Sequence, residues 1–360
     1  MRLRVLAFAF FLLPCAVPAP AQHRGPRVGG LLFAGLDFAA RQKGDTGFEL
    51  AQAAGLLNVG FTDHFDAVTE VTATPVDGRE RIRVERLFAR YAFNDALKLS
   101  AGRFHTPIAY WNTAYHHGAW LQTSVARPEL IRFGTPLLPL HFAGIQAEGL
   151  LPPAPLGLGY VVAAGRGRGS DPETPGRTGE LAGWDGRPAW VARVYSRPPA
   201  LGRVQVGASG YLDRAVARTG TRVDERILSA HLAWEMDWPE VLAEYAHLQH
   251  RPAGSGGGWA GGEAWYVQVG GRLYGRSEGI KGYGRMERVR VSAADSLLGP
   301  LHPRYDGAVL GLRVDVTPFA MVRGELRQEQ RAVTGRANSV LLEASVVLAR
   351  SSDRPSLHSH

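Results

Sequence analysis

The sequence predicts an all-β protein, a transmembrane antiparallel up-and-down β-barrel of about 16 strands with one long loop folded inward. Three observations predict this fold. The N-terminus has the features of a secretory signal peptide, the rest of the chain alternates between apolar and polar residues over strand-length segments, and the polar positions of these segments are rich in charge. Only one cysteine occurs in 360 residues. A disulfide framework and a cysteine-ligated metal centre are therefore excluded.

The first 21 residues (1–21) are expected to be a signal peptide. Arg2 and Arg4 precede the apolar run Val5–Leu13, and the small residues Ala19 and Ala21 follow at the positions that a signal peptidase reads. A buried helix is a poor alternative because three prolines in the same segment would break it. The cysteine also lies here, and this leaves a lipoprotein anchor as a second, weaker alternative.

Downstream of this segment the sequence alternates with a period of two. Between 308 and 316 every even position is apolar, whereas Arg313 and Asp315 occupy odd positions. Such segments exceed the usual globular strand of about 5–6 residues and approach the roughly 9–11 residues that a tilted membrane strand needs. We place sixteen strands at 29–41, 47–60, 62–74, 80–93, 96–105, 138–151, 157–166, 188–196, 202–213, 225–237, 240–250, 262–274, 278–291, 304–316, 319–330 and 337–349.

The orientation of the apolar face decides between a membrane barrel and a soluble β-sandwich, which also alternates. The polar face is unusually charged, and many apolar-face positions are small, which lipid tolerates and a packed core would not use. Closure into a barrel also pairs every backbone amide within the bilayer. Aromatic residues near the predicted strand ends are expected to form interfacial girdles: Tyr160, Trp190, Tyr195, Tyr211, Trp234, Trp238, Trp265 and Tyr274.

Composition and charge exclude further classes. A mean hydropathy of −0.12 is too low for a polytopic helical membrane protein, and a hydrophobic content of 45% is too high for a wholly disordered chain. The net charge of +8 comes from arginines spread along the strands rather than clustered, so no nucleic-acid partner is expected. No phosphate-binding glycine motif occurs either, and no cofactor is expected.

The barrel is expected to comprise residues 22–349, with a polar tail at 350–360. Tight turns are predicted at Asn94-Asp95 and Thr317-Pro318, and long connections at 165–187 and 251–261. The connection 106–137 is rich in aromatic and histidine side chains, which would be costly to leave exposed to water. We therefore expect it to fold into the lumen as a constriction loop.

One segment resembles a known family. The strand end Ala101-Gly102-Arg103-Phe104, then Pro107 and Trp111-Asn112, a long loop, and re-entry through Gly144-Ile145 with Glu148-Gly149 are similar to bacterial outer-membrane porins related to the phosphate-selective porins O and P. The resemblance implies a sixteen-stranded trimeric channel whose third loop narrows the lumen, in the outer membrane of a Gram-negative-type bacterium. The resemblance does not indicate the substrate, because lysine is scarce and the basic loop residues that would mark phosphate selectivity are not evident. The C-terminus also differs, since a polar tail follows the last strand where such barrels commonly end on an aromatic residue.

The expected function is passive diffusion of small hydrophilic solutes with a modest preference for anions, because inward arginines slightly outnumber carboxylates. The expected partners are membrane lipid, lipopolysaccharide and the solutes themselves. Any single arginine could instead form an ion pair with a neighbouring strand. The residues expected to line the pore or its constriction are Arg86, Arg90, Arg103, His105, Trp111, Asn112, His116, His117, Arg127, Glu148, Arg193, Arg285, Arg313, Arg323 and Arg327.

Arg103 needs a separate explanation, because it has the same parity as Leu99 and Ala101 on the apolar side of its strand. We expect a bulge at Gly102 that turns Arg103 inward.

Two alternative functions remain. An outer-membrane lipid or ester hydrolase needs a nucleophile beside a histidine, and Ser124 with His116 or His117 could supply one, although no G-x-S-x-G elbow is present. A metal-binding receptor could use His105, His116, His117 and His141, since imidazole suits zinc, copper or nickel. Hydrogen-bonding loop histidines are the simpler interpretation of the same residues.

Overall fold

The computed structural model describes residues 27–41, 47–76, 79–116, 121–133, 135, 137–152, 154–168, 186–216, 221–275, 279–299 and 304–350. The predicted signal peptide and all of the predicted tail except Arg350 lie outside these residues. No helix in the described part of the chain is long and apolar enough to cross a membrane.

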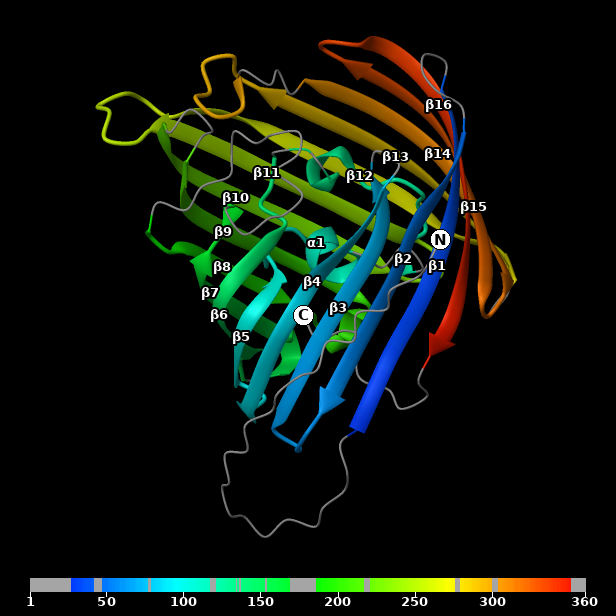
Figure 1. The fold of residues 1–360 in the computed structure, drawn as a ribbon, viewed down its shortest axis with the longest axis horizontal. Helices are drawn as coiled ribbons and strands as arrows, with labels where there is room; N and C mark the ends of the chain where they lie inside the picture. Colours follow the sequence, from blue (N-terminus) through cyan, green and yellow to red (C-terminus); the bar gives the residue numbers. More distant parts are fainter. Residues whose placement is uncertain are drawn as a thin grey trace.

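Sixteen strands form one antiparallel sheet within the described residues, as predicted. Each strand pairs with the next along the chain, and β1 pairs with β16 to close the barrel (Figure 1). The strands are β1 (Arg27–Arg41), β2 (Gly47–Gly60), β3 (Phe65–Val76), β4 (Arg79–Asn94), β5 (Leu97–His105), β6 (His141–Leu150), β7 (Leu158–Arg166), β8 (Ala189–Ser196), β9 (Val204–Val216), β10 (Arg222–Glu235), β11 (Glu240–Pro252), β12 (Ala260–Gly275), β13 (Gly279–Val291), β14 (Tyr305–Thr317), β15 (Ala320–Arg331) and β16 (Gly335–Arg350).

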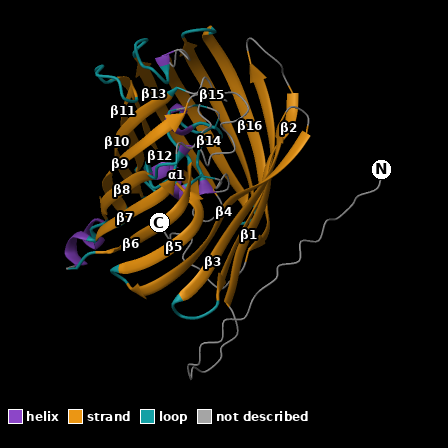
Figure 2. Ribbon diagram, turned by 60° about the vertical axis from the view of Figure 1, so that its left-hand side comes forward, coloured by secondary structure: helices purple, strands orange, loops and turns teal. Residues whose placement is uncertain are grey.

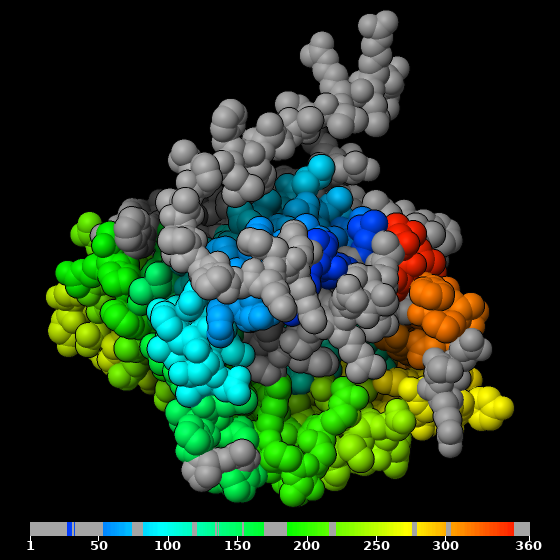
Figure 3. All heavy atoms as spheres, turned by 90° about the horizontal axis from the view of Figure 1, so that it is seen from below, coloured from blue at the N-terminus to red at the C-terminus, as the bar shows by residue number. Residues whose placement is uncertain are grey.

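Every predicted strand overlaps an observed one, and the ends differ by a few residues. The short helices are α1 (Tyr110–Ala114) and the 3-10 turns η2 (Glu129–Ile131), η3 (Ala154–Leu156) and η5 (Pro199–Leu201). In the space-filling view of Figure 3, the blue N-terminal and red C-terminal residues lie next to each other, as the pairing of β1 with β16 requires.

The outward face of the barrel is apolar. Leu310 in β14 is 66% exposed and Leu228 in β10 is 64% exposed, while their neighbours along each strand, Val309 and Ser229, are buried. Apolar burial is the main favourable contribution to folding, and leaving so many large aliphatic side chains in water would cost roughly 25 cal/mol for each Å² of apolar surface. This face therefore needs lipid around it, and the barrel is transmembrane.

The expected aromatic girdles are found in part. Trp190, Trp234, Trp238 and Tyr274 are exposed on the outside, but Tyr195 and Tyr211 are buried inside the barrel, so their assignment to a girdle was wrong. The strand alternation explains the error, because Tyr195 shares the inward parity of Arg193 in β8. Most exposed aromatic residues gather at the barrel end that carries the short turns: Phe61, Phe65, Tyr91, Phe93, Trp234, Trp238, Tyr274 and Phe319.

The predicted bulge at Gly102 is also wrong. Pairing of β5 with β4 and with β6 continues through Gly102 without a register shift. Gly102 nevertheless has φ +138°, and a Cβ there would lie 2.2 Å from the backbone oxygen of Leu87, so only glycine fits.

The irregularity lies one strand away, between β3 and β4. Glu70 pairs with Arg86 and Val71 with Val84, so Glu85 is the additional residue of a bulge. As a result, two successive side chains of β4 point inward: Glu85 is fully buried and Arg86 forms an ion pair with the buried Glu70. The bulge therefore concentrates charge on the inner face of β4.

Candidate functional site

The connection between β5 and β6 lies inside the barrel, as Figures 1 and 2 show for α1. Its apolar side chains are buried although they belong to a loop: Ile108 and Ile131 have no exposed surface and Trp111 is 1% exposed. They pack against inward side chains of the wall, including Leu248 and Tyr266. The prediction of an inward-folded loop is confirmed.

Carboxylates of the barrel wall hold the loop by its backbone amides. Glu244 in β11 accepts hydrogen bonds from the backbone N–H of Tyr110 at 2.6 Å and of Trp111 at 2.8 Å, at the start of α1. Glu325 in β15 accepts from the N–H of Val125 at 2.9 Å and of Ala126 at 3.1 Å. Each of these side chains thereby satisfies two backbone donors of the loop that would be costly to bury without a partner.

Arginines of the wall hold the same loop by its carbonyl oxygens. Arg313 donates to the Gln122 oxygen at 2.7 Å, Arg323 donates to the Gln122 and Ser124 oxygens, and Arg285 donates to the Ala126 oxygen at 2.9 Å. Arg285 and Arg323 are 2% and 1% exposed. These three arginines face the interior as expected, but their charges are engaged by the loop and by wall carboxylates.

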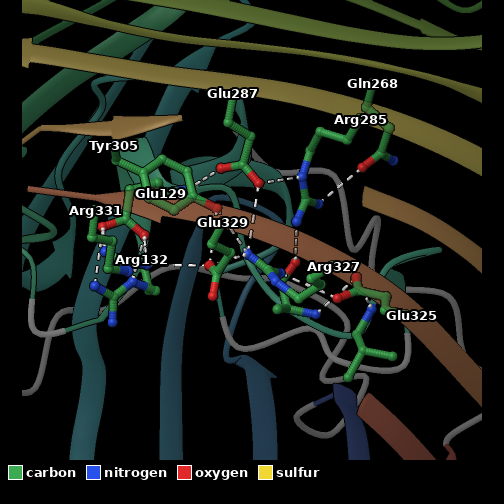
Figure 4. A network of polar contacts seen from close by, with 12 residues as sticks. Glu129, Arg132, Gln268, Arg285, Glu287, Tyr305, Glu325, Arg327, Glu329 and Arg331 are labelled. Carbon is green, nitrogen blue, oxygen red and sulfur yellow. Dashed lines mark hydrogen bonds and ion pairs between the residues drawn. The ribbon is translucent and has the colours of Figure 1, made fainter. Parts of the chain in front are cut away.

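A continuous ionic network connects the loop to β13 and β15 (Figure 4). Arg327 lies 3.2 Å from Glu325, 3.2 Å from Glu329 and 3.8 Å from Glu287. Arg285 pairs with Glu287 at 2.9 Å, and Glu287 in turn accepts a hydrogen bond from the backbone N–H of Glu129 in the loop. A buried network of this kind is costly to break, because removing one member leaves the others desolvated without a countercharge.

Glu129 forms the loop's end of the network. It pairs with Arg132 at 2.7 Å and with Arg331 of β15 at 2.8 Å. Burial by itself would raise the pKa of the Glu129 carboxyl, but the hydrogen bonds and charges of Arg331 and Arg132 outweigh it and lower the pKa below its ordinary value. Glu129 is therefore held as a carboxylate.

The opposite side of the lumen, along β3–β6, is organised differently. Arg86 pairs with Glu70 at 2.5 Å, and Arg90 pairs with Asp66 at 3.0 Å and with Glu148 at 3.5 Å. A cavity of about 30 Å³, enough for one or two waters, lies between these side chains and the loop. On this side the charges pair across strands and leave a small polar space.

The remaining predicted lining residues have varied roles. Asn112 joins the two ends of the loop, because its Nδ2 donates to the backbone oxygens of Thr106 at 2.9 Å and Leu140 at 3.0 Å. Arg193 donates to Thr113 Oγ1 at 2.8 Å. The Arg127 guanidinium lies 3.4 Å over the Phe133 ring, and Arg103 Nε donates to the Glu85 backbone oxygen at 3.2 Å. His117 lies outside the described residues.

Three of the four candidate metal ligands come together. His105 ends β5, His141 begins β6, and His116 follows α1, yet their ring nitrogens lie within 4.8 Å of one another and all three side chains are buried. The rings of His105 and His116 stack with centroids 3.8 Å apart. His141 Nε2 lies 2.9 Å from Glu85 Oε2. This group could hold a metal ion.

The hydrolase arrangement is not assembled around His116. Ser124 is buried, and its Oγ has no hydrogen-bond partner among the described residues. His116 Nδ1 instead forms a 2.6 Å hydrogen bond with Asn112 Oδ1. The pair of Ser124 with His117 involves a residue outside the described part of the chain.

Sequence reasoning missed the wall glutamates as site residues. Glu244, Glu287 and Glu325 lie on the charged inner face of their strands, but the sequence pattern did not indicate that they bind the loop. A usable signal exists: several inward glutamates face a loop whose segment 106–137 contains only three charged residues. Backbone amides and uncharged polar side chains of the loop are therefore the main donors that these glutamates can meet.

Comparison with known proteins extends the description of the fold. No protein-family model matches the chain, and no curated relative matches it. Its solved structural neighbours include an anion-selective porin from Comamonas acidovorans, with a TM-score of 0.62 and 10% identity over 89% of this chain and 99% of that one. A second neighbour is the trimer form of the Vibrio cholerae outer membrane protein OmpT, with a TM-score of 0.57 and 12% identity over 90% of this chain and 99% of that one. A third is a Salmonella typhi OmpF complex with daunomycin, with a TM-score of 0.55 and 8% identity over 89% of this chain and 97% of that one.

These identities are low, so the likeness concerns the fold. The specific relation to the phosphate-selective porins O and P is not confirmed by any of these matches. Closed sixteen-stranded topology, an apolar outer face and an inward loop are all present. The chain has the fold of outer-membrane porins.

Proposed function

We propose that this protein is an outer-membrane channel for passive diffusion of small hydrophilic solutes, narrowed by the loop 106–137. The observation that carries the proposal is a closed barrel whose outer face is apolar and whose inner face is ionised on most strands. Ionised groups facing inward require water or countercharges, and a barrel of this size encloses an aqueous channel in porins.

The permeation path in this proposal runs beside β3–β6. There the cavity bounded by Arg86, Arg90, Thr113 and Glu148 lies between the wall and the loop. Arg86 keeps a fifth of its side chain exposed, in contrast to the fully buried Arg285. The charges that a passing ion meets are therefore expected to be those of β3–β6.

A modest anion preference is part of the proposal. Carboxylates compensate most inward arginines, so the field across the lumen is weak and a strong selectivity is not expected. Arg193 supports an excess of positive charge inside the barrel. Among its described contacts is a hydrogen bond to the Thr113 hydroxyl, and none of them is an ion pair with a carboxylate. The chain as a whole carries +8.

The proposal includes the cellular setting. The N-terminal sequence supports export with cleavage after Ala21. The apolar outer face supports insertion into the outer membrane of a Gram-negative-type bacterium, in contact with lipid and lipopolysaccharide. Assembly as a homotrimer is supported by a structural neighbour described as a trimer.

Planar-bilayer recording tests the channel directly. Purified protein is expected to insert with stepwise conductance increases and, in a salt gradient, to give a reversal potential of the sign expected for anions. Heat-denatured protein is the matched control. A folded preparation that remains silent would contradict the channel, whereas stepwise openings with a cation-type reversal potential would contradict only the anion preference.

A further inference from the structure

The histidine cluster His105–His116–His141 joins parts of the chain that are separate in the sequence. Two members belong to paired strand positions, because His105 in β5 is directly opposite His141 in β6. The third, His116, comes from the inward loop. All three are buried, with 7%, 2% and 0% of their surface exposed. Burying three polar rings side by side costs solvation energy, which coordination of an ion would offset.

The three histidines bring their ring nitrogens into one small region. One ring nitrogen of each lies within 4.8 Å of those of the other two. In a tetrahedral zinc site with Zn–N bonds of about 2.0–2.1 Å, ligand atoms lie about 3.3 Å apart. Binding of an ion would therefore require rotation of the side chains, which includes separating the stacked rings of His105 and His116.

A carboxylate completes the group. Glu85 is fully buried by the bulge in β4, its Oε2 lies 2.9 Å from His141 Nε2, and its Oε1 accepts a hydrogen bond from Thr72 at 2.9 Å. A buried carboxylate requires a positive partner. A divalent cation held between Glu85 and the three imidazoles would place positive charge next to this carboxylate. Glu70 lies farther from His105, at 3.6 Å, and is engaged by Arg86.

The orientation of His116 is set by a neighbour. Its Nδ1 is hydrogen-bonded to Asn112 Oδ1 at 2.6 Å, so Nε2 is the nitrogen that would coordinate the ion. A hydrogen bond to the second ring nitrogen is the usual support of a metal-bound histidine. Asn112 also holds both ends of the loop through Thr106 and Leu140, so it couples this orientation to the position of the loop.

From this arrangement we propose that His105, His116 and His141, with Glu85 as fourth ligand, bind one divalent transition-metal ion of the zinc type inside the barrel. Imidazole favours zinc, nickel and copper over the hard cations magnesium and calcium. The ion would connect the inward loop, through His116, to β4, β5 and β6. The site is independent of whether the barrel conducts.

The test uses the mature protein folded in detergent, prepared without a polyhistidine tag and treated with a chelator. Calorimetric titration with Zn²⁺ is expected to give one equivalent bound per barrel, and Mg²⁺ under the same conditions is expected to give no binding. Electron paramagnetic resonance of the Cu²⁺-loaded wild-type protein is expected to show coupling to three nitrogen donors. This measurement does not depend on any variant.

Variants locate the ion. His116→Gln and His141→Gln are each expected to weaken Zn²⁺ binding by about 100-fold or more, and Asn112→Ala by roughly tenfold. His231→Gln is the matched control, because His231 is also a buried, inward histidine but stacks on Tyr110 away from the cluster. Removal of 351–360 eliminates His358 and His360 and is expected to leave the binding unchanged.

Heat-modifiable migration confirms that each variant is folded before its titration is interpreted. Absence of Zn²⁺ binding by the folded wild type overturns the proposal. Binding that the His231 variant loses and the cluster variants keep also overturns it. A Cu²⁺ spectrum with fewer than three nitrogen donors does so as well.

Discussion

The two sides of the barrel interior use the same kind of residue for different purposes. Along β11–β15, Glu244, Glu325 and Arg323 bind backbone groups of the inward loop. Along β3–β6, Arg90 pairs with wall carboxylates beside a small polar cavity. Inward charge therefore does not by itself identify a pore-lining residue. The course of the loop decides whether a charge anchors the constriction or faces the solute.

The largest effect is expected where the network is densest. Arg327→Ala leaves Glu287, Glu325 and Glu329 without their shared cation, which should destabilise the folded barrel by about 3 kcal/mol or more. The measurement is the temperature at which the compact form is lost in heat-modifiable electrophoresis. Arg290→Ala is the control, because its pair with Asp306 is partly exposed and should contribute about 1 kcal/mol or less. If both variants lowered this temperature equally, the distinction between the buried network and the exposed ion pair would be contradicted.

The next effect concerns the loop alone. Glu244→Ala removes the acceptor for the Tyr110 and Trp111 amides and for the Tyr266 hydroxyl, with an expected local cost of about 3 kcal/mol. The loop should then be released at α1, so single-channel conductance and its noise should increase. Glu263→Ala serves as the control, since Glu263 is exposed and accepts only a 3.3 Å bond from Tyr245 among its described hydrogen bonds. Unchanged conductance in a folded Glu244 variant would argue against the anchoring role.

A smaller effect should appear with pH. Arg331 and Arg132 overcome the burial of Glu129 and lower its folded pKa below the unfolded value of about 4.3. The contribution of Glu129 is therefore complete above pH 4.3 and is lost as pH falls through the lower folded pKa, so acid should loosen the loop. Conductance noise recorded from about pH 6 down to about pH 3 should therefore increase toward the acidic end of that range. Glu129→Gln should remove most of this pH dependence, and a wild-type trace without it would contradict the assignment.

The smallest free-energy change is expected on the β3–β6 side of the lumen, where it should affect ion selectivity specifically. Arg90→Gln removes a cation next to the cavity while Asp66 and Glu148 remain, so the anion-to-cation permeability ratio should fall by a factor on the order of two or three. Reversal potentials in a salt gradient measure this ratio. Arg285→Gln is the comparison, since a guanidinium engaged by the loop and by Glu287 should influence stability more than selectivity. The reverse ranking would place the permeation path along β13 instead.

Several features of the fold could be predicted locally. Alternation over 308–316 assigns Leu310 and Leu312 to the outside, and both are exposed there. Tyr195 was misplaced because its aromatic character was given more weight than its parity, which puts it inside with Arg193. The bulge assigned to Gly102 was misplaced by one strand, because Arg103 disturbs the pattern of β5 while the additional residue is Glu85 in β4.

The site was predictable only in outline. That His105 and His141 lie close together follows from their positions at the two ends of one loop between paired strands. That His116 reaches the same point depends on the whole path of the loop through the lumen. The same holds for Glu325, which binds amides about 200 residues away in sequence.

The sequence by itself determined the strands, the faces of the strands and the inward position of the loop. These properties depend on a period of two residues and on the different solvation of apolar and ionised side chains, both of which are local. Only the tertiary structure decided which inward charges hold the loop and which border the cavity, and which histidines meet. These outcomes depend on hydrogen-bond distances between segments far apart in sequence, where a shift of one residue in register reverses the direction of every side chain in a strand.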